Sequence, residues 1–113
     1  MRIFKKTWGY EEVWAETSRY ISKFLYIDPH SRLDRQYHNT KIKSLCVIEG
    51  KLTLTTDDSD GTRIVRFLTK GETFHINQKL IHVLSTSDEG AMVVEVSTPE
   101  QDDVVILETD HDQ

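Results

Sequence analysis

The sequence predicts an all-β protein folded as a single domain over residues 1–113, and three observations support this prediction. Residues 51–55 alternate polar and apolar side chains, which is the period of a half-buried strand. Clusters of Gly, Pro and Asp separate such segments at the spacing of a sandwich or barrel. No window of a dozen residues sustains the apolar spacing of an amphipathic helix.

Strands are expected wherever short segments with alternation or β-branched side chains end in turn residues, about nine or ten in all. In chain order, such segments include residues 10–16, 20–27, 44–48, 51–55, 62–68, 81–87 and 91–96. The first of these also carries helix-favouring residues, but it is assigned as a strand. Segments 44–48 and 91–96 are largely apolar, which favours burial on both faces. Gly, Pro or Asp residues predict turns at 28–29, 49–50, 57–61, 70–71 and 89–90.

Composition and charge narrow the classes of partner. The formal net charge is -5 and the isoelectric point is about 5.5, so no basic face for nucleic acid or an anionic membrane is expected. Cys46 is the only cysteine, which excludes an intrachain disulfide and a thiolate metal cluster. No segment approaches the roughly 20 apolar residues of a membrane span, and the first residues lack the apolar run of a signal peptide. A cytoplasmic location is therefore expected.

Two histidines, a glutamine and a lysine are singled out by their places on the predicted strands. If residues 34–38 are extended, Gln36 and His38 point the same way. His82 has leucines two residues before and after it, so it is expected to face the core. On the next strand, Lys43 shares a face with Leu45 and Val47. A buried imidazole needs a hydrogen-bond partner or a metal, and either histidine taken alone is more often a satisfied core residue than a ligand.

Other polar residues have simpler interpretations. The acidic segment 57–60 lacks the ligand spacing of an EF-hand loop and is expected to be a solvated hairpin turn. Arg32, Arg35 and Lys41 lie near the strand that carries Gln36 and His38, where one of them can hold a substrate phosphate. An exposed basic cluster that offsets the acidic surface is the commoner arrangement.

Several segments resemble the cupin family. Residues 36–38 (Gln-Tyr-His) followed by Lys43 and Gly50 have the spacing of the first cupin motif, in which two ligands one residue apart precede a Glu and then a Gly. Residues 71–82 resemble the second motif, where a turn precedes the last His. The chain is also similar to mannose-6-phosphate isomerase-like cupins, which include the C-terminal isomerase domain of bifunctional mannose-1-phosphate guanylyltransferases. That similarity is carried by residues 6–11, 32–38 and 94–105.

The resemblance implies a double-stranded β-helix, the jelly-roll barrel of cupins, with a divalent metal ion inside it. Carried over by position, the metal ligands are Gln36, His38 and His82, and the ion is Zn, Mn, Fe or Ni. The remaining ligand position, a Glu in the family, is Lys43 in this chain. Basic residues that the family often carries near the chain end are also replaced, with Ile106 at one such position.

The charge and position of Lys43 decide whether a metal ion can still bind at that site. A protonated lysine about 4 Å from a dication repels it by roughly 8 kcal/mol at an effective dielectric constant near 20. Three arrangements are open: burial removes the proton from Lys43, the side chain swings toward the barrel mouth, or the ammonium takes the place of the metal and stabilises an anionic group directly.

Three functions are compatible with the resemblance. The first is isomerisation of a sugar phosphate, with a metal or Lys43 polarising the carbonyl and His38 or His82 moving the proton. The second is a non-catalytic cupin that binds a carbohydrate or small anion, which the loss of the Glu favours. The third is a structural protein with a filled barrel. The expected partner of the first two is a sugar or sugar phosphate, and a homodimer formed through edge strands is also expected.

Overall fold

Every regular element in the computed structural model is a strand, and the residues it describes are 2–100 and 102–109. The strands are β1 (Arg2–Lys6), β2 (Gly9–Glu16), β3 (Ile21–Ile27), β4 (Arg35–Tyr37), β5 (Lys43–Asp57), β6 (Arg63–Thr69), β7 (Thr73–Ile76), β8 (Ile81–Ser85), β9 (Ala91–Ser97) and β10 (Val105–Glu108). The all-β prediction is confirmed. This part of the chain has no helix capable of crossing a membrane.

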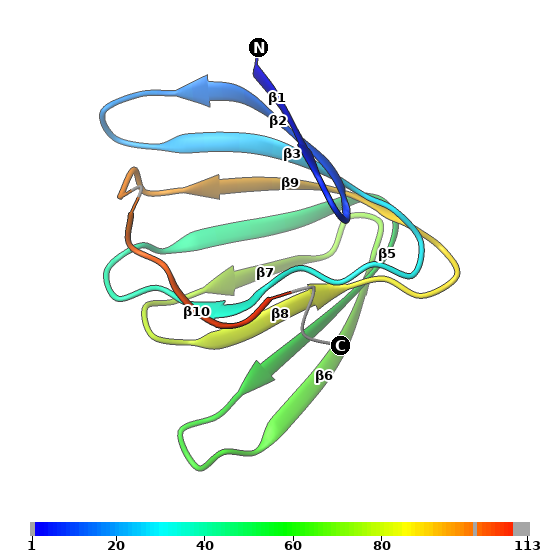
Figure 1. Cartoon of the computed structure of the whole chain (residues 1–113), viewed down its shortest axis with the longest axis vertical. Coiled ribbons are helices and arrows are strands. Elements are labelled where there is room, and N and C mark those ends of the chain that lie inside the picture. Colours follow the sequence, from blue (N-terminus) through cyan, green and yellow to red (C-terminus); the bar gives the residue numbers. More distant parts are fainter. Residues whose placement is uncertain (1, 101, 110–113) are drawn as a thin grey trace.

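The strands form two antiparallel sheets that share β5 and curl toward each other (Figure 1). The first half of β5 pairs with β7 and β9, and the sheet continues from β9 through β3 and β2 to β1. The second half of β5 pairs with β6 and β8, and the sheet continues from β8 through β4 to β10. This order places β3 and β9, which are distant in the sequence, side by side in one wall of the barrel.

A single strand of 15 residues, β5, replaces the two short strands expected on either side of residues 49–50. Its register with β9 shifts between Val47 and Glu49, and Gly50 has a φ of 80°, a left-handed conformation that glycine adopts readily. The turn predicted at this point is therefore wrong. The chain bends at Gly50 and passes from one sheet to the other without reversing its direction.

The apolar core lies between the two sheets, and each long strand contributes one face to it. Leu45, Leu54 and Val93 are at most 1 % exposed. Alternate residues of β5 and β9 are only partly buried, so the prediction that segments 44–48 and 91–96 are buried on both faces is wrong. Both segments belong to an antiparallel sheet, which can leave one face uncovered.

Stacked aromatic side chains lie on the outer face of β2 and β3. Tyr10 stacks on Tyr26 with ring centroids 4.4 Å apart, and Trp14 lies 6.1 Å from Phe24. Trp14 is 51 % exposed, so it does not fill the core. The homodimer stays a prediction, and this aromatic face is a candidate surface for it.

Candidate functional site

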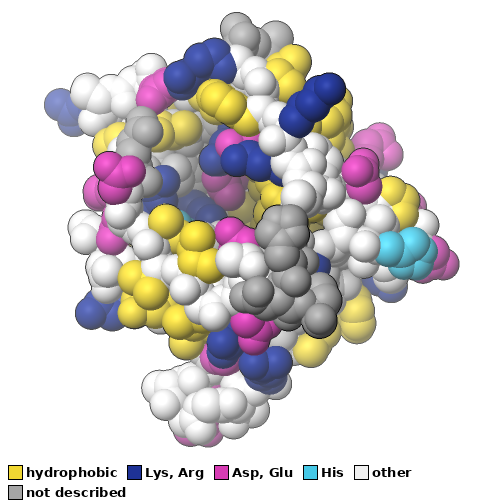
Figure 2. All heavy atoms as spheres, viewed as in Figure 1, with side chains coloured by type: hydrophobic (Ala, Val, Ile, Leu, Met, Phe, Trp, Pro, Cys, Tyr) yellow, Lys and Arg dark blue, Asp and Glu magenta, His cyan; other side chains and the backbone are white. Residues whose placement is uncertain are grey.

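The barrel contains a cavity of about 640 Å³, and Figure 2 shows a hollow in which charged side chains gather. Among the described residues, five lysines outnumber three carboxylates in its lining. These charged residues are Lys5, Lys6, Lys23, Lys41, Lys43, Glu11, Asp34 and Glu95. Gln36, His38 and His82 also line the cavity, together with apolar side chains such as Trp8 and Leu25. The lining therefore carries an excess of positive charge.

The structure brings the predicted site residues Gln36, His38, Lys43 and His82 to this one cavity. Gln36 on β4 is the direct antiparallel partner of His82 on β8. The rings of His38 and His82 lie nearly parallel with their centroids 5.8 Å apart, and the two residues are 6 % and 1 % exposed. Alternation thus correctly gave Gln36 and His38 a common face and turned His82 inward, and the resemblance implied that these residues and Lys43 share one site. Their catalytic and metal-binding roles stay predictions.

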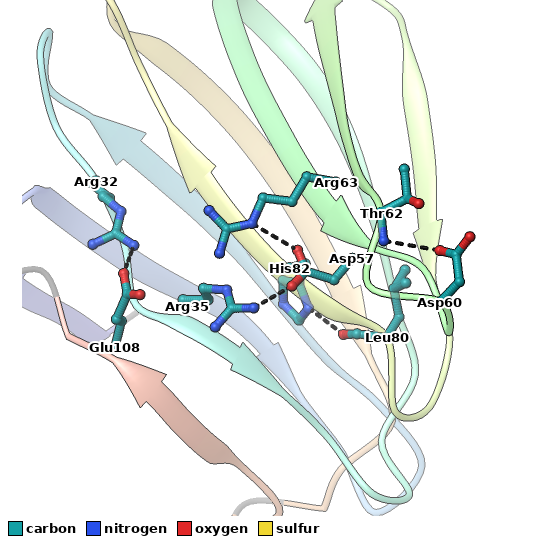
Figure 3. A network of polar contacts seen from close by, with 9 residues as sticks. All are labelled: Arg32, Arg35, Asp57, Asp60, Thr62, Arg63, Leu80, His82 and Glu108. Carbon is teal, nitrogen blue, oxygen red and sulfur yellow. Dashed lines mark hydrogen bonds and ion pairs between the residues drawn. The ribbon is translucent and has the colours of Figure 1, made fainter.

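His82 presents an unpaired nitrogen inside the barrel. Its Nδ1 lies 2.9 Å from the carbonyl oxygen of Leu80 (Figure 3). A carbonyl oxygen only accepts hydrogen bonds, so Nδ1 carries the proton and Nε2 presents a lone pair. Nε2 is buried and has no hydrogen-bond partner among the described residues. Because an unsatisfied buried acceptor is unfavourable, this atom is suited to a hydroxyl group or a cation supplied by a ligand.

His38 and His82 are both neutral at pH 7. Burial, followed by the positive charge of Lys43, lowers the pKa of each imidazole from 6.5 to about 4. Neutral imidazoles add no positive charge to the cavity, and each keeps a nitrogen that can accept a proton or a hydrogen bond.

A row of alternating charges crosses the inner face of the first sheet, and we call it the charge ladder. It runs Lys43–Glu95–Lys23–Glu11–Lys6 and takes one residue from each of the adjacent strands β5, β9, β3, β2 and β1. The distances between Nζ and the carboxylate oxygen are 3.5, 3.8, 3.0 and 3.8 Å in that order. The side chain of Lys43 is 9 % exposed and that of Lys6 is 41 % exposed, so the ladder runs from the interior outward.

Glu95 is the buried counterion of Lys43. Burial opposes ionisation of Glu95, but the positive charges of Lys43, Lys23 and Lys41 outweigh it and hold the pKa of this carboxyl below its usual value. The sequence analysis missed Glu95 and Lys23 as site residues. The sequence did contain a signal for Glu95, because it lies two residues after Val93 and so shares the buried face of an apolar strand.

Of the three basic residues suggested for a phosphate, Lys41 is the one found in the cavity lining. Arg32 pairs with Glu108, and Arg35 pairs with Asp57 (Figure 3). Lys41 makes no ion pair with a carboxylate in residues 2–100 and 102–109. Burial, only partly offset by Glu95, lowers the pKa of Lys41 below its usual value. Lys41 is thus available to an anionic ligand.

The segment after β9 runs back along the barrel to β4 and helps to wall the cavity (Figure 1). The carboxylate of Asp103 accepts hydrogen bonds from the backbone N–H groups of Asn39, Thr40 and Lys41 at 3.1, 2.6 and 2.7 Å. Asp103 therefore fastens this segment to the loop that begins beside His38. Ile106 on β10 adds an apolar side chain to the cavity lining.

The donor set does not fit the divalent metal that the resemblance implies. No group of three His, Cys, Asp or Glu side chains among the described residues is arranged to hold a metal ion. Two imidazoles and one amide oxygen remain, and an ammonium occupies the position of the carboxylate. Glu95, the nearest carboxylate to Lys43, is already paired with Lys43 and Lys23. A dication there would meet the ammonium of Lys43 and would find no unpaired carboxylate ligand in this donor set.

We expect the protein to lose stability as the pH falls from about 6.5 toward 4. The folded state holds both histidines neutral while the unfolded state binds protons in this window, so protonation favours unfolding, by at most roughly 3 kcal/mol for each histidine. Urea unfolding at several pH values measures the effect. His82→Asn, which keeps a donor near the Leu80 carbonyl, should reduce the pH dependence. His75→Asn on the exposed face should leave it unchanged, and an equal slope in all three proteins would contradict the assignment.

Comparison with protein families matches residues 1–109 to the family described as "Mannose-6-phosphate isomerase C-terminal". No curated protein matches the chain.

Solved structures with the same fold include the capsular polysaccharide assembling protein CapF from Staphylococcus aureus, at 18 % identity and a TM-score of 0.83, covering 96 % of this chain and 34 % of CapF. Oxalate decarboxylase from Bacillus subtilis aligns at 18 % identity and a TM-score of 0.81, covering 94 % of this chain and 30 % of the enzyme. A protein with a double-stranded β-helix domain from Klebsiella pneumoniae subsp. pneumoniae aligns at 19 % identity and a TM-score of 0.74, covering 88 % of this chain and 84 % of that protein. The chain thus spans about a third of CapF and of oxalate decarboxylase. These likenesses confirm the predicted double-stranded β-helix.

Proposed function

The chain belongs to the mannose-6-phosphate isomerase C-terminal family of cupins, and from this premise we propose that its cavity binds a small sugar that carries a phosphate or carboxylate group. The observation that carries the proposal is the excess of lysines over carboxylates in a cavity with a buried ammonium, Lys43, at its inner end. The volume of about 640 Å³ lies within the roughly 300–1,000 Å³ usual for small-molecule sites.

The anionic group is expected at Lys41 and Lys43. Lys23 lies between the two carboxylates of the charge ladder, so its charge is the most fully balanced of the ladder lysines. Lys6, at the outer end of the ladder, is 41 % exposed and pairs with Glu11. Lys43 shares Glu95 with Lys23, and Lys41 makes no ion pair with a described carboxylate. Ammonium groups in a partly desolvated site form strong charge-assisted hydrogen bonds with phosphate or carboxylate oxygens.

The sugar hydroxyls are expected at Gln36 and His82, which line the same cavity. Nε2 of His82 is a buried acceptor without a described partner, and a hydroxyl group of the ligand can donate to it. Gln36 lines the same part of the cavity and offers both a donor and an acceptor. A ligand that carries both an anionic group and hydroxyls therefore matches the lysines and the histidine acceptor that line this one cavity.

Binding is favoured over efficient isomerisation because the histidines are weak bases. General base catalysis is best when the pKa of the base lies near the working pH. The pKa values of His38 and His82 are about 4, so proton abstraction from a sugar carbon near pH 7 is disfavoured.

A slow isomerase is the second candidate, and the presence of Lys43 and of the lone pair of His82 Nε2 in one cavity favours it. In this reaction Lys43 would hydrogen-bond the carbonyl oxygen at C1 of an open-chain aldose. His82 would accept the proton from C2 and return it to C1, while the proton of the C2 hydroxyl moves to the oxygen on C1, which gives the ketose. The two candidates use the same cavity and differ in whether the proton is moved.

We expect mannose 6-phosphate to bind the wild-type protein and neutral mannose to bind at least tenfold more weakly, because a charge-assisted hydrogen bond contributes about 1.5–3 kcal/mol. Isothermal titration calorimetry gives the dissociation constants. Lys43→Gln should weaken binding of the phosphate by about ten- to a hundredfold, whereas Lys70→Gln, at an exposed site outside the cavity, should have no effect.

Equal affinity for the neutral and phosphorylated sugar, or an unchanged affinity in Lys43→Gln, would refute the binding proposal. An assay for fructose 6-phosphate with the same protein decides the second candidate. Turnover in the presence of a chelator that disappears in His82→Asn supports the isomerase, and no turnover above that of His82→Asn removes it.

A further inference from the structure

We propose that the Lys43 ammonium is the resident cation of this barrel, standing where the family resemblance implies a divalent metal, so that the wild-type chain does not load one. The inference concerns the protein without ligand and does not depend on which sugar the cavity accepts. We therefore expect that Lys43 alone prevents a divalent metal from binding in the cavity, and that replacing Lys43 allows the metal to bind.

The place of Lys43 supports the proposal. Gln36, His38 and His82, which the resemblance assigns as metal ligands, all line the cavity that Lys43 enters from the start of β5. The rings of His38 and His82 have their centroids 5.8 Å apart. The lone pair of His82 Nε2 has no described partner, and a divalent cation would need this electron pair. The ammonium of Lys43 therefore lines the same cavity as the donors a metal would use.

The charge ladder keeps Lys43 inside the barrel. Nζ of Lys43 lies 3.5 Å from an Oε atom of Glu95, and both side chains are less than one tenth exposed. Glu95 is the direct antiparallel partner of Lys23, which is itself 3.0 Å from Glu11. Because each carboxylate is shared between two lysines, movement of Lys43 to solvent would leave a buried carboxylate with less compensation. The arrangement in which the side chain swings to the mouth is not the one observed.

Glu95 does not replace the missing carboxylate ligand. Glu95 reaches the cavity from β9, and its two carboxylate oxygens already pair with Lys23 on β3 and Lys43 on β5. In the described part of the chain, no set of three His, Cys, Asp or Glu side chains is placed to hold a metal. A carboxylate at position 43 would remove the ammonium and add an oxygen donor to the cavity that His38 and His82 line. Lys43 is therefore the side chain whose replacement should admit a metal.

The experiment compares metal uptake by untagged wild-type protein, Lys43→Glu and Lys41→Glu. The last variant makes the same charge change at a cavity lysine that is not at the ligand position. Each protein is equilibrated with Zn²⁺ or Mn²⁺, desalted and analysed for bound metal, and the dissociation constant is measured by competition with a chromophoric chelator. Thermal unfolding shows whether each variant is folded. His38→Asn/His82→Asn gives the background from surface histidines.

Wild-type protein and Lys41→Glu should retain no more metal than the background variant. Lys43→Glu should retain about one equivalent, with an affinity at least about a hundredfold above that of wild type, and His82→Asn in the same chain should abolish the gain. If Lys43→Glu does not fold, Lys43→His supplies a neutral donor for the same comparison.

Two results would overturn the proposal. One is retention of a metal equivalent by the wild-type protein that is lost in His38→Asn/His82→Asn. The other is a folded position-43 variant that stays at background or gains no more metal than Lys41→Glu. Neither result depends on sugar binding, so a failure here is distinguishable from failure of the proposed function.

Discussion

Glu95→Gln is expected to lower the free energy of unfolding by about 3–5 kcal/mol, the range measured when one partner of a buried ion pair is removed. The glutamine has nearly the same shape, so the change isolates the charge. Glu95 is 6 % exposed and its carboxylate faces both Lys43 and Lys23. Lys23 keeps Glu11, but Lys43 would be left buried without a carboxylate within ion-pair distance among the described residues. Chemical denaturation at pH 7 and low salt measures the loss.

The matched control is Glu89→Gln, which removes a carboxylate from an exposed turn and should change stability by no more than about 0.5 kcal/mol. Replacing both partners, as in Lys43→Met/Glu95→Leu, should recover part of the loss, because no uncompensated charge is then left at position 43. A Glu95→Gln protein within about 1 kcal/mol of wild type would show that the inner end of the charge ladder is not buried as described.

Gly50→Ala is expected to cost at least about 3 kcal/mol, because two unfavourable effects coincide at the bend of β5. The left-handed φ of 80° disfavours any residue with a Cβ. That Cβ would also lie 2.0 Å from the carbonyl oxygen of Gly90 and 3.0 Å from Cα of Ala91. Both are backbone atoms at or just before the start of β9, which pairs with β5 at this point, so neither can rotate away as a side chain could. The thermal midpoint and the free energy of unfolding should both fall.

Gly71→Ala separates the two effects. Gly71 has a φ of 86°, but a Cβ there would have nothing within 4 Å. Its cost should be the conformational term alone, about 1–2 kcal/mol. Equal losses at the two glycines would mean that the close approach of Gly50 to Gly90 contributes nothing to the fold.

Much of the candidate site could be predicted from local sequence. Alternation in a strand fixes which side chains share a face, and this period gave Gln36 and His38 a common face and turned His82 toward the interior. It also gave Lys43 a common face with Leu45, which is buried. The same local logic failed at residues 49–50, because Glu-Gly is compatible with a turn and with a bend inside one strand. Pairing with β9 on one side of the bend and with β6 and β8 on the other decides between them.

What the sequence by itself determined was the all-β class, the inward direction of His82 and, through resemblance, the cupin family and the grouping of Gln36, His38, Lys43 and His82. The tertiary structure alone decided which charges meet: that Glu95 neutralises Lys43, that Lys41 and not Arg32 or Arg35 lines the cavity, and that five adjacent strands form a charge ladder. The physical reason is that alternation is a property of one strand, whereas contacts across a sheet depend on strand order and register. Here β9 lies between β3 and β5, an arrangement that no local pattern encodes.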